Sequence, residues 1–278
     1  MDVIAWVGLP FASLINNYAI IALPLARQSF SLVRLGSERN RHMLPVRGRS
    51  RLSVVDSAVE SSMISTRDLS LLPDVDDLRC TLQSMAILDA VLCPEWQFRC
   101  YSFNAAWCPG EQLGSMRNGS GDNFFAHFSP AGCWLKGFAQ EYPMSLFRTK
   151  PNLVWLGVLE AVPAEFAACL REPAFSVGIV TFCIWRRYSD QSWQIGPIDF
   201  PVGHADPDGS GFLLSNLDGR PETYWDWAKE YYEREVSLAA VEHVYQHWPL
   251  TPEIVGQLNP DLSPADLIAD VKQIGYPG

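Results

Sequence analysis

The chain changes composition at Met63, and this break decides which part of it can form a folded core. Residues 1–62 contain seven arginines, no lysine and four acidic residues, for a net charge of +3. Residues 63–278 contain 14 basic and 27 acidic residues, for a net charge of −13, and the two values sum to the −10 of the whole chain. Hydrophobic residues make up 48% of the chain, which excludes a disordered or fibrous protein. We therefore expect residues 63–278 to form a single domain with its own core.

We expect residues 1–62 to be poorly ordered, and three interpretations of them are open. Residues 3–26 carry no charge and are long enough to span a bilayer as a membrane anchor, although Pro10 and Pro24 interrupt them. The arginines that follow would then leave the rest of the chain in the cytoplasm. The Arg- and Ser-rich stretch 27–53 is instead typical of a targeting leader. In the third interpretation translation starts at Met63, and the residues before it are an over-extended reading of the gene.

The cysteines predict a reduced compartment. There are seven of them, an odd number, and none forms a CxxC pair. Most lie among apolar residues, as Cys183 does in the stretch VTFCIW, where a free thiol behaves as a small hydrophobic side chain. We expect a cytoplasmic protein. The alternative is a protein anchored in the membrane through residues 3–26 with its body in the cytoplasm.

Hydrophobic periodicity predicts an α+β fold with one core. Apolar residues three and four apart from Val75 to Leu92 predict a helix that ends before Pro94. Alternating or β-branched stretches predict strands over 96–100, 124–128, 133–138, 177–185 and 212–214, and a partner strand that carries Trp193 and Ile195. A helix is expected from Val162 to about residue 171. The fold class is α+β, with an N-terminal helix and an antiparallel meander of about five to six strands.

The last third of the chain predicts helices. Proline follows a turn or a capping residue at Pro221, Thr251-Pro252 and Ser263-Pro264, which is typical of helix N-termini. A further apolar stretch from Leu238 to Trp248 predicts another helix. These helices are expected to pack on the same core as the strands.

Two groups of residues have partial metal-site patterns. His243 and His247 are four residues apart on an expected helix, but the Glu of an HExxH motif is missing between them. Asp206 and Asp208 open a stretch similar to a calcium loop, but Leu217 stands where that loop needs a bidentate Glu. We therefore predict no metal and no cofactor, with these four residues as weak metal candidates.

The most polar turn is RNGSGD at 117–122. It combines a cation, a hydroxyl, two glycines and a carboxylate, so its backbone N–H groups are candidates for binding an anion. A hairpin turn is the simpler interpretation. We predict no catalytic residues, because no nucleophile elbow, dinucleotide fingerprint or kinase motif is present. If the chain is an enzyme, the first residues to test are Arg117, Ser120, Asp122 and His127.

The expected helix after Pro221 combines aromatic and acidic residues. Its candidate binding residues are Trp225, Trp227, Glu230, Tyr231 and Glu233. The net charge of −13 on residues 63–278 repels nucleic acid and attracts a basic protein, so we expect a basic protein partner and no nucleic acid. A membrane is expected as a partner only if residues 3–26 are an anchor. The sequence does not define the oligomeric state.

Five stretches resemble an uncharacterised family of bacterial cytosolic proteins. They are LCPEW at 92–96, SMRNGSGD at 115–122, TFCIWRRYSD at 181–190, PETYWDWAKEYYE at 221–233 and LNPDLSPADLIADVKQIGYP at 258–277. The size, acidity and expected architecture are also similar to those of SUKH-type immunity proteins. These resemblances imply a non-catalytic acidic protein-binding module, of the immunity type that neutralises a basic toxin. The alternatives are an enzyme with a site around the 117–127 hairpin and a membrane-tethered cytoplasmic scaffold.

Overall fold

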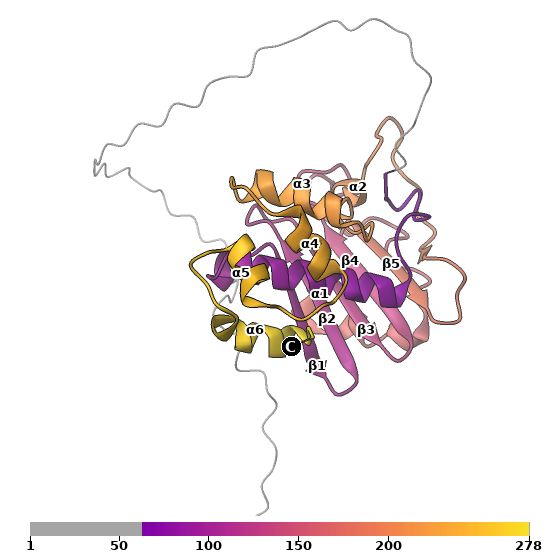
Figure 1. Ribbon diagram of the computed structural model, residues 1–278. Helices are drawn as coiled ribbons and strands as arrows, with labels where there is room; N and C mark the ends of the chain where they lie inside the picture. The colour runs from indigo at the N-terminus through magenta and orange to yellow at the C-terminus, as the bar shows by residue number, and fades with distance from the viewer. Residues whose placement is uncertain (1–62, 278) are drawn as a thin grey trace, which may run out of the picture. The chain divides into compact units, whose positions relative to one another are not determined.

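An antiparallel sheet of six strands forms the centre of the structure, a computed structural model that describes residues 63–277. The strands are β1 (Tyr101–Cys108), β2 (Glu111–Arg117), β3 (Asn123–Ser129), β4 (Gly132–Phe138), β5 (Phe182–Arg187) and β6 (Gln194–Ile195). They lie side by side in sequence order, so each pairs with the strand that precedes it. This arrangement is a meander (Figure 1), as expected when short turns join consecutive strands.

One long helix, α1 (Val75–Leu92), lies across the sheet and packs on β1 and β2 (Figure 1). It begins where the Asp74 side chain accepts hydrogen bonds from the backbone N–H groups of Asp76 and Asp77. Almost all of its residues from Leu78 onward are buried, because the C-terminal helices cover the side that faces away from the sheet. The helix is therefore a layer inside the core.

The C-terminal part of the chain supplies the outer helices. They are α2 (Ser210–Leu213), α3 (Pro221–Tyr231), α4 (Leu238–Tyr245), α5 (Pro252–Leu258) and α6 (Ile268–Ile274). Helices α4, α5 and α6 contact α1, and α6 also contacts β1 (Figure 1). The predicted α+β fold, with an N-terminal helix, an antiparallel sheet and C-terminal helices, is confirmed.

The two faces of the sheet carry separate apolar clusters. Alternate residues of β4 point to opposite faces, so Cys133 and Leu135 join the cluster around α1 while Trp134 joins the other. The second cluster is covered by three short 3₁₀ turns, η2 (Ala164–Phe166), η3 (Cys169–Arg171) and η4 (Pro173–Phe175). Within the described chain, the backbone hydrogen bonds of residues 164–179 are local to this segment.

Four local predictions are wrong in whole or in part. The strand expected over 177–185 starts only at Phe182, where β5 begins. Residues 96–98 form a 3₁₀ turn, η1 (Trp96–Phe98), and the strand starts later, at Tyr101, because the Arg99 side chain bonds back to the carbonyls of Cys93 and Pro94. The expected helix from Val162 is the series of 3₁₀ turns described above, since prolines 163 and 173 limit its length. The expected strand at 212–214 falls mainly within α2, whose first N–H groups bond to the Asp206 carboxylate.

The predictions for residues 1–62, which include poor order, the membrane anchor, the leader and the start at Met63, lie outside the described residues. In residues 63–277, no helix combines the length and the apolar character that crossing a bilayer requires.

Candidate functional site

A groove with a volume of about 490 Å³ lies where three segments distant in the sequence meet. We call it the arginine–tyrosine groove. One wall comes from η1 and the residues around it, another from the β2–β3 turn, and the third from the C-terminal end of α3. Its lining residues are Cys93, Gln97, Phe98, Arg99, Arg117, Asn118, Gly119, Tyr231, Tyr232 and Glu233.

Arg99 holds the first wall in place. Its Nε donates to the Cys93 carbonyl at 2.8 Å and one terminal nitrogen donates to the Pro94 carbonyl at 2.8 Å. The other terminal nitrogen pairs with the Asp270 carboxylate of α6 at 2.5 Å, and the Arg99 side chain is only 6% exposed. A buried guanidinium with these partners ties η1 to α6 and serves as scaffold rather than as a binding cation.

Arg117 and Trp96 form one side of the groove entrance. The Arg117 guanidinium lies over the indole ring of Trp96, 3.8 Å from its centroid, and donates to the Trp96 carbonyl at 2.8 Å. Trp96 is 47% exposed, and its neighbour Phe98 is 60% exposed. Aromatic rings that remain this accessible beside a groove are suited to packing against a partner.

A buried carboxylate, that of Asp89 in α1, lies close to the groove residue Tyr232. One Asp89 oxygen accepts from the backbone N–H groups of Cys100 and Tyr101 at 2.9 and 2.7 Å, and the other accepts from the Tyr224 hydroxyl at 2.7 Å. Burial raises the pKa of Asp89 to about 6, against the lowering effect of these hydrogen bonds. Asp89 therefore connects α1, the start of β1 and α3 at one point.

The helix that combines acidic and aromatic residues is α3. Only some of the five predicted binding residues line the groove. Tyr231 and Glu233 line the groove, and Glu230 is exposed on the preceding turn. Trp225 is half-buried, with its Nε1–H bonded to the Val236 carbonyl. Trp227 packs among four tyrosines, which are Tyr101, Tyr224, Tyr231 and Tyr232.

The 117–122 turn joins β2 to β3 and is stabilised by its own side chains. Asn118 donates to the Asp122 carboxylate at 2.8 Å and accepts from the Ser120 N–H at 2.9 Å. Asp122 also accepts from the Gln140 N–H at 2.8 Å. His127 lies elsewhere, opposite Leu113 in the β2–β3 register, while Arg117 pairs with Asn123. At about 3.3 Å per residue, His127 is more than 10 Å along the strand from the turn.

The weak metal candidates have partners within the chain. His243 Nε2 is 2.9 Å from the Pro249 carbonyl, and His247 Nε2 is 3.0 Å from the Cys80 carbonyl.

The aspartates are similarly occupied. The Asp206 carboxylate accepts from the N–H groups of Gly211 and Phe212 in α2. The buried Asp208 accepts from the hydroxyls of Thr66 and Ser210 at 2.5 and 2.6 Å. Burial raises the pKa of Asp208. Among residues 63–277, no three His, Cys, Asp or Glu side chains are arranged to hold a metal ion.

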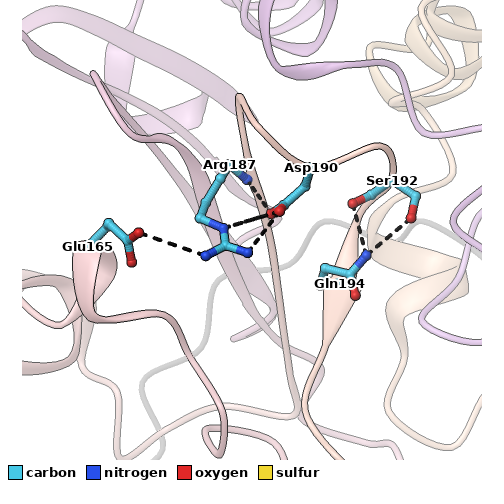
Figure 2. A network of polar contacts seen from close by, with 5 residues as sticks. All are labelled: Glu165, Arg187, Asp190, Ser192 and Gln194. Atoms are coloured by element: carbon cyan, nitrogen blue, oxygen red, sulfur yellow. Dashed lines mark hydrogen bonds and ion pairs between the residues drawn. The ribbon is translucent and has the colours of Figure 1, made fainter.

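A second groove of about 660 Å³ runs beside β5 and β6, and the sequence analysis did not identify it. Figure 2 shows its polar network, in which Arg187 bonds to the Asp190 carboxylate and faces Glu165 at 3.8 Å, while Gln194 bonds to Ser192. These contacts pair the polar groups with one another across a tight turn. The network therefore stabilises the β5–β6 connection, and the arginine–tyrosine groove, with its accessible rings, is the better binding candidate.

Sequence reasoning missed Phe98 and Arg99 as parts of a site. Both had been placed in a strand, and only the 3₁₀ turn brings Phe98 to the surface beside Tyr231. No protein-family model, curated protein or solved structure matches the chain, so the resemblances drawn from the sequence stay predictions.

Proposed function

We propose that the chain is a protein-binding module that binds a basic segment of its partner in the arginine–tyrosine groove. The observation that carries the proposal is the exposure of two aromatic rings that line one groove, Phe98 at 60% and Tyr231 at 38%, and of Trp96 at 47%, which stacks on the lining residue Arg117. Rigid aromatic side chains of this kind provide most of the binding energy in protein interfaces. Nothing in the groove lining pairs a nucleophile with a base, because its thiol, Cys93, bonds to the Glu95 carbonyl.

The basic character of the partner follows from the charges around the groove. Arg99 is paired with Asp270 and the Arg117 guanidinium lies over the Trp96 ring, whereas the carboxylates of Glu230 and Glu233 are exposed at the C-terminal end of α3. Residues 63–278 as a whole carry 27 acidic against 14 basic residues. An acidic rim around aromatic anchors speeds the encounter with a basic partner and excludes acidic ones.

The narrower proposal is an immunity protein that neutralises a basic toxin. It rests on the resemblance to SUKH-type immunity proteins and on the acidic rim. Co-expression with a candidate basic toxin, chosen from the genes that neighbour this one, tests it. Protection that disappears in the Phe98→Ala variant supports the proposal, and equal protection by that variant and the wild type contradicts it.

Site-specific photo-crosslinking tests the general proposal. A photoreactive phenylalanine analogue replaces Phe98 or Tyr231 in the full chain in its native host, and Trp248, which is 57% exposed on another surface, is the control position. We expect the same protein to be crosslinked from both groove positions and not from residue 248. That protein is then purified and its affinity measured at low and high salt.

The affinity of the purified pair separates the groove from other surfaces. Phe98→Ala and Tyr231→Ala are expected to weaken binding by about tenfold or more, and Trp248→Ala by less than about twofold. Binding should also weaken as salt rises, because the rim charges become screened. Groove variants that bind as tightly as the wild type, or crosslinks that come equally from residue 248, would refute the proposal.

A further inference from the structure

A cysteine, a histidine and a glutamate form a continuous hydrogen-bonded array beneath the 3₁₀ turns that cover the second face of the sheet. Cys169 Sγ lies 3.3 Å from His127 Nδ1, and His127 Nε2 lies 3.0 Å from Glu111 Oε2. Glu111 is the first residue of β2, His127 lies in β3 and Cys169 begins η3. The array is at the opposite end of β2 from the arginine–tyrosine groove, so it is independent of the proposed binding function.

The strand register explains why Glu111 and His127 meet. His127 pairs directly with Leu113, and side chains two residues apart on a strand share a face. Glu111 is therefore the diagonal neighbour of His127 on the second face, at a distance that long side chains can bridge. The Cys169 side chain reaches the same face from the covering segment.

The two contacts assign the protons of the imidazole ring. An ionised carboxylate only accepts hydrogen bonds, so Nε2 of His127 carries the hydrogen that Glu111 accepts. In the neutral imidazole Nδ1 is then the unprotonated nitrogen, and the proton it faces is that of the Cys169 thiol. A nucleophile, a base and a group that orients the base stand here in the order required for covalent catalysis.

The resting array is closed. Cys169 is 3% exposed and His127 is 6% exposed, and the ring of Phe175 packs on the imidazole at 5.8 Å between the centroids. Burial, followed by the Glu111 charge, raises the pKa of Cys169 to about 12, so the thiol keeps its proton in this form. Phe175 belongs to the short 3₁₀ turn η4, and its ring also packs on Trp107, Phe125 and Trp134, so a smaller side chain at this position would open space beside the imidazole.

One buried donor near the array lacks an acceptor. Trp134 pairs with His127 across β3 and β4, and its ring lies 5.4 Å from that of Phe175. Its Nε1–H is close enough to the Cys183 thiol to lower the pKa of that thiol. The contact falls outside hydrogen-bonding geometry, so the N–H has no acceptor. A buried N–H without an acceptor is costly.

We propose that Cys169 is a catalytic nucleophile for the hydrolysis of an activated acyl compound, a thioester or an ester, with His127 as the base and Glu111 as a positioning residue. The thiol proton moves to Nδ1 of His127 as Sγ bonds to the carbonyl carbon. The bond to the leaving sulfur or oxygen breaks, and that atom takes the proton from Nδ1. Water then attacks the acyl-thioester, which releases a carboxylic acid and restores the Cys169 thiol.

The test uses the full chain and p-nitrophenyl acetate, and mass spectrometry measures the rate of acetylation at each cysteine. Phe175→Ala is expected to raise the rate at Cys169 at least tenfold over the wild type and to make it at least tenfold faster than at Cys183. Cys183 is a buried thiol in the same cluster without a histidine partner, and the exposed Cys108 reports general thiol reactivity. Rates at Cys108 should stay within twofold in every variant.

Further variants separate catalysis from simple exposure of the thiol. Adding His127→Gln to Phe175→Ala should lower the Cys169 rate at least tenfold and remove the rate plateau at neutral pH, so that the rate rises steadily with pH as for an unassisted thiol. Glu111→Gln should lower it less. An unchanged Cys169 rate after His127→Gln, or equal rates at Cys169 and Cys183, would overturn the proposal.

If Phe175→Ala does not fold, Phe175→Leu takes its place. Phe166→Leu is the matched control, since it removes an equally buried ring from the same covering segment. The proposal requires Phe175→Leu to accelerate Cys169 acetylation more than Phe166→Leu does, and equal acceleration contradicts the assigned cover.

Discussion

The buried Asp89 carboxylate predicts an unusual dependence of stability on pH. Its pKa is about 6 in the folded protein, where it is fully buried, against a usual value of 3.8. The folded state therefore binds a proton more tightly than the unfolded state does. For a raised pKa, the stability contribution is fully present below about pH 4 and is lost as the pH rises through 6, so this group makes the protein less stable at neutral pH than in mild acid.

The size of the effect follows from the shift. A difference of 2.2 pKa units, 6 minus 3.8, corresponds to about 3 kcal/mol at pH 8, at about 1.4 kcal/mol per unit. At pH 5 the penalty is about half as large, because the unfolded state is ionised while the folded state is mostly protonated.

Asp89→Asn removes the titration. The amide oxygen can still accept from the N–H groups of Cys100 and Tyr101, and the Tyr224 hydroxyl can turn to accept from the amide nitrogen.

Urea unfolding of both proteins between pH 5 and pH 8 measures this contribution. We expect the free energy of unfolding of Asp89→Asn, relative to the wild type, to increase by about 1–2 kcal/mol from pH 5 to pH 8. Asp226→Asn, which changes an exposed carboxylate on α3, is the control and should shift by less than about 0.5 kcal/mol.

Two outcomes would refute the reasoning. Parallel pH profiles for Asp89→Asn and the wild type would mean that Asp89 does not titrate differently in the two states. A wild type that loses stability relative to the variant as the pH falls would mean that the hydrogen bonds to the carboxylate outweigh its desolvation.

Two further predictions concern the scaffold. Arg99→Gln leaves the partly buried Asp270 without its ion pair and should lower the free energy of unfolding by about 3 kcal/mol in urea, and a loss below about 0.5 kcal/mol would show that Arg99 is not the anchor of η1. Gly137→Ala places a Cβ 2.2 Å from the Phe182 ring and should lower the free energy of unfolding by about 1–3 kcal/mol, seen as a lower urea midpoint. An unchanged midpoint would mean that the Phe182 ring moves aside without cost.

The elements that the sequence predicted well are those with local signals. Helix α1 is marked by the Asp74 cap, an apolar stripe and Pro94, and its observed bounds, Val75–Leu92, match the prediction. The β3–β4 hairpin is marked by two apolar stretches around a Pro-Ala-Gly turn. In each case the residues that decide the structure lie within a few positions of it.

The sites escaped prediction because contacts distant in the sequence create them. The groove joins η1, the β2–β3 turn and the end of α3, and its scaffold pair joins Arg99 to Asp270, 171 residues away. His127 was a candidate, but its partner Cys169 lies 42 residues later in a segment predicted to be a helix. No spacing rule connects a residue in a strand to one in a 3₁₀ turn of the cover.

Both faces of the sheet bury polar groups, and the hydroxyls of Tyr232 and Tyr245 beside the α1 cluster lack a hydrogen-bond partner as the Trp134 N–H does on the other face. On the α1 face, Asp89 has two backbone donors and a tyrosine hydroxyl. On the other face, Lys136 is 1% exposed and donates to two neutral oxygens, those of Ile179 and Asn123, so burial lowers its pKa to about 8. Trp134 adds an N–H without an acceptor. Apolar residues of similar volume would stabilise this face more.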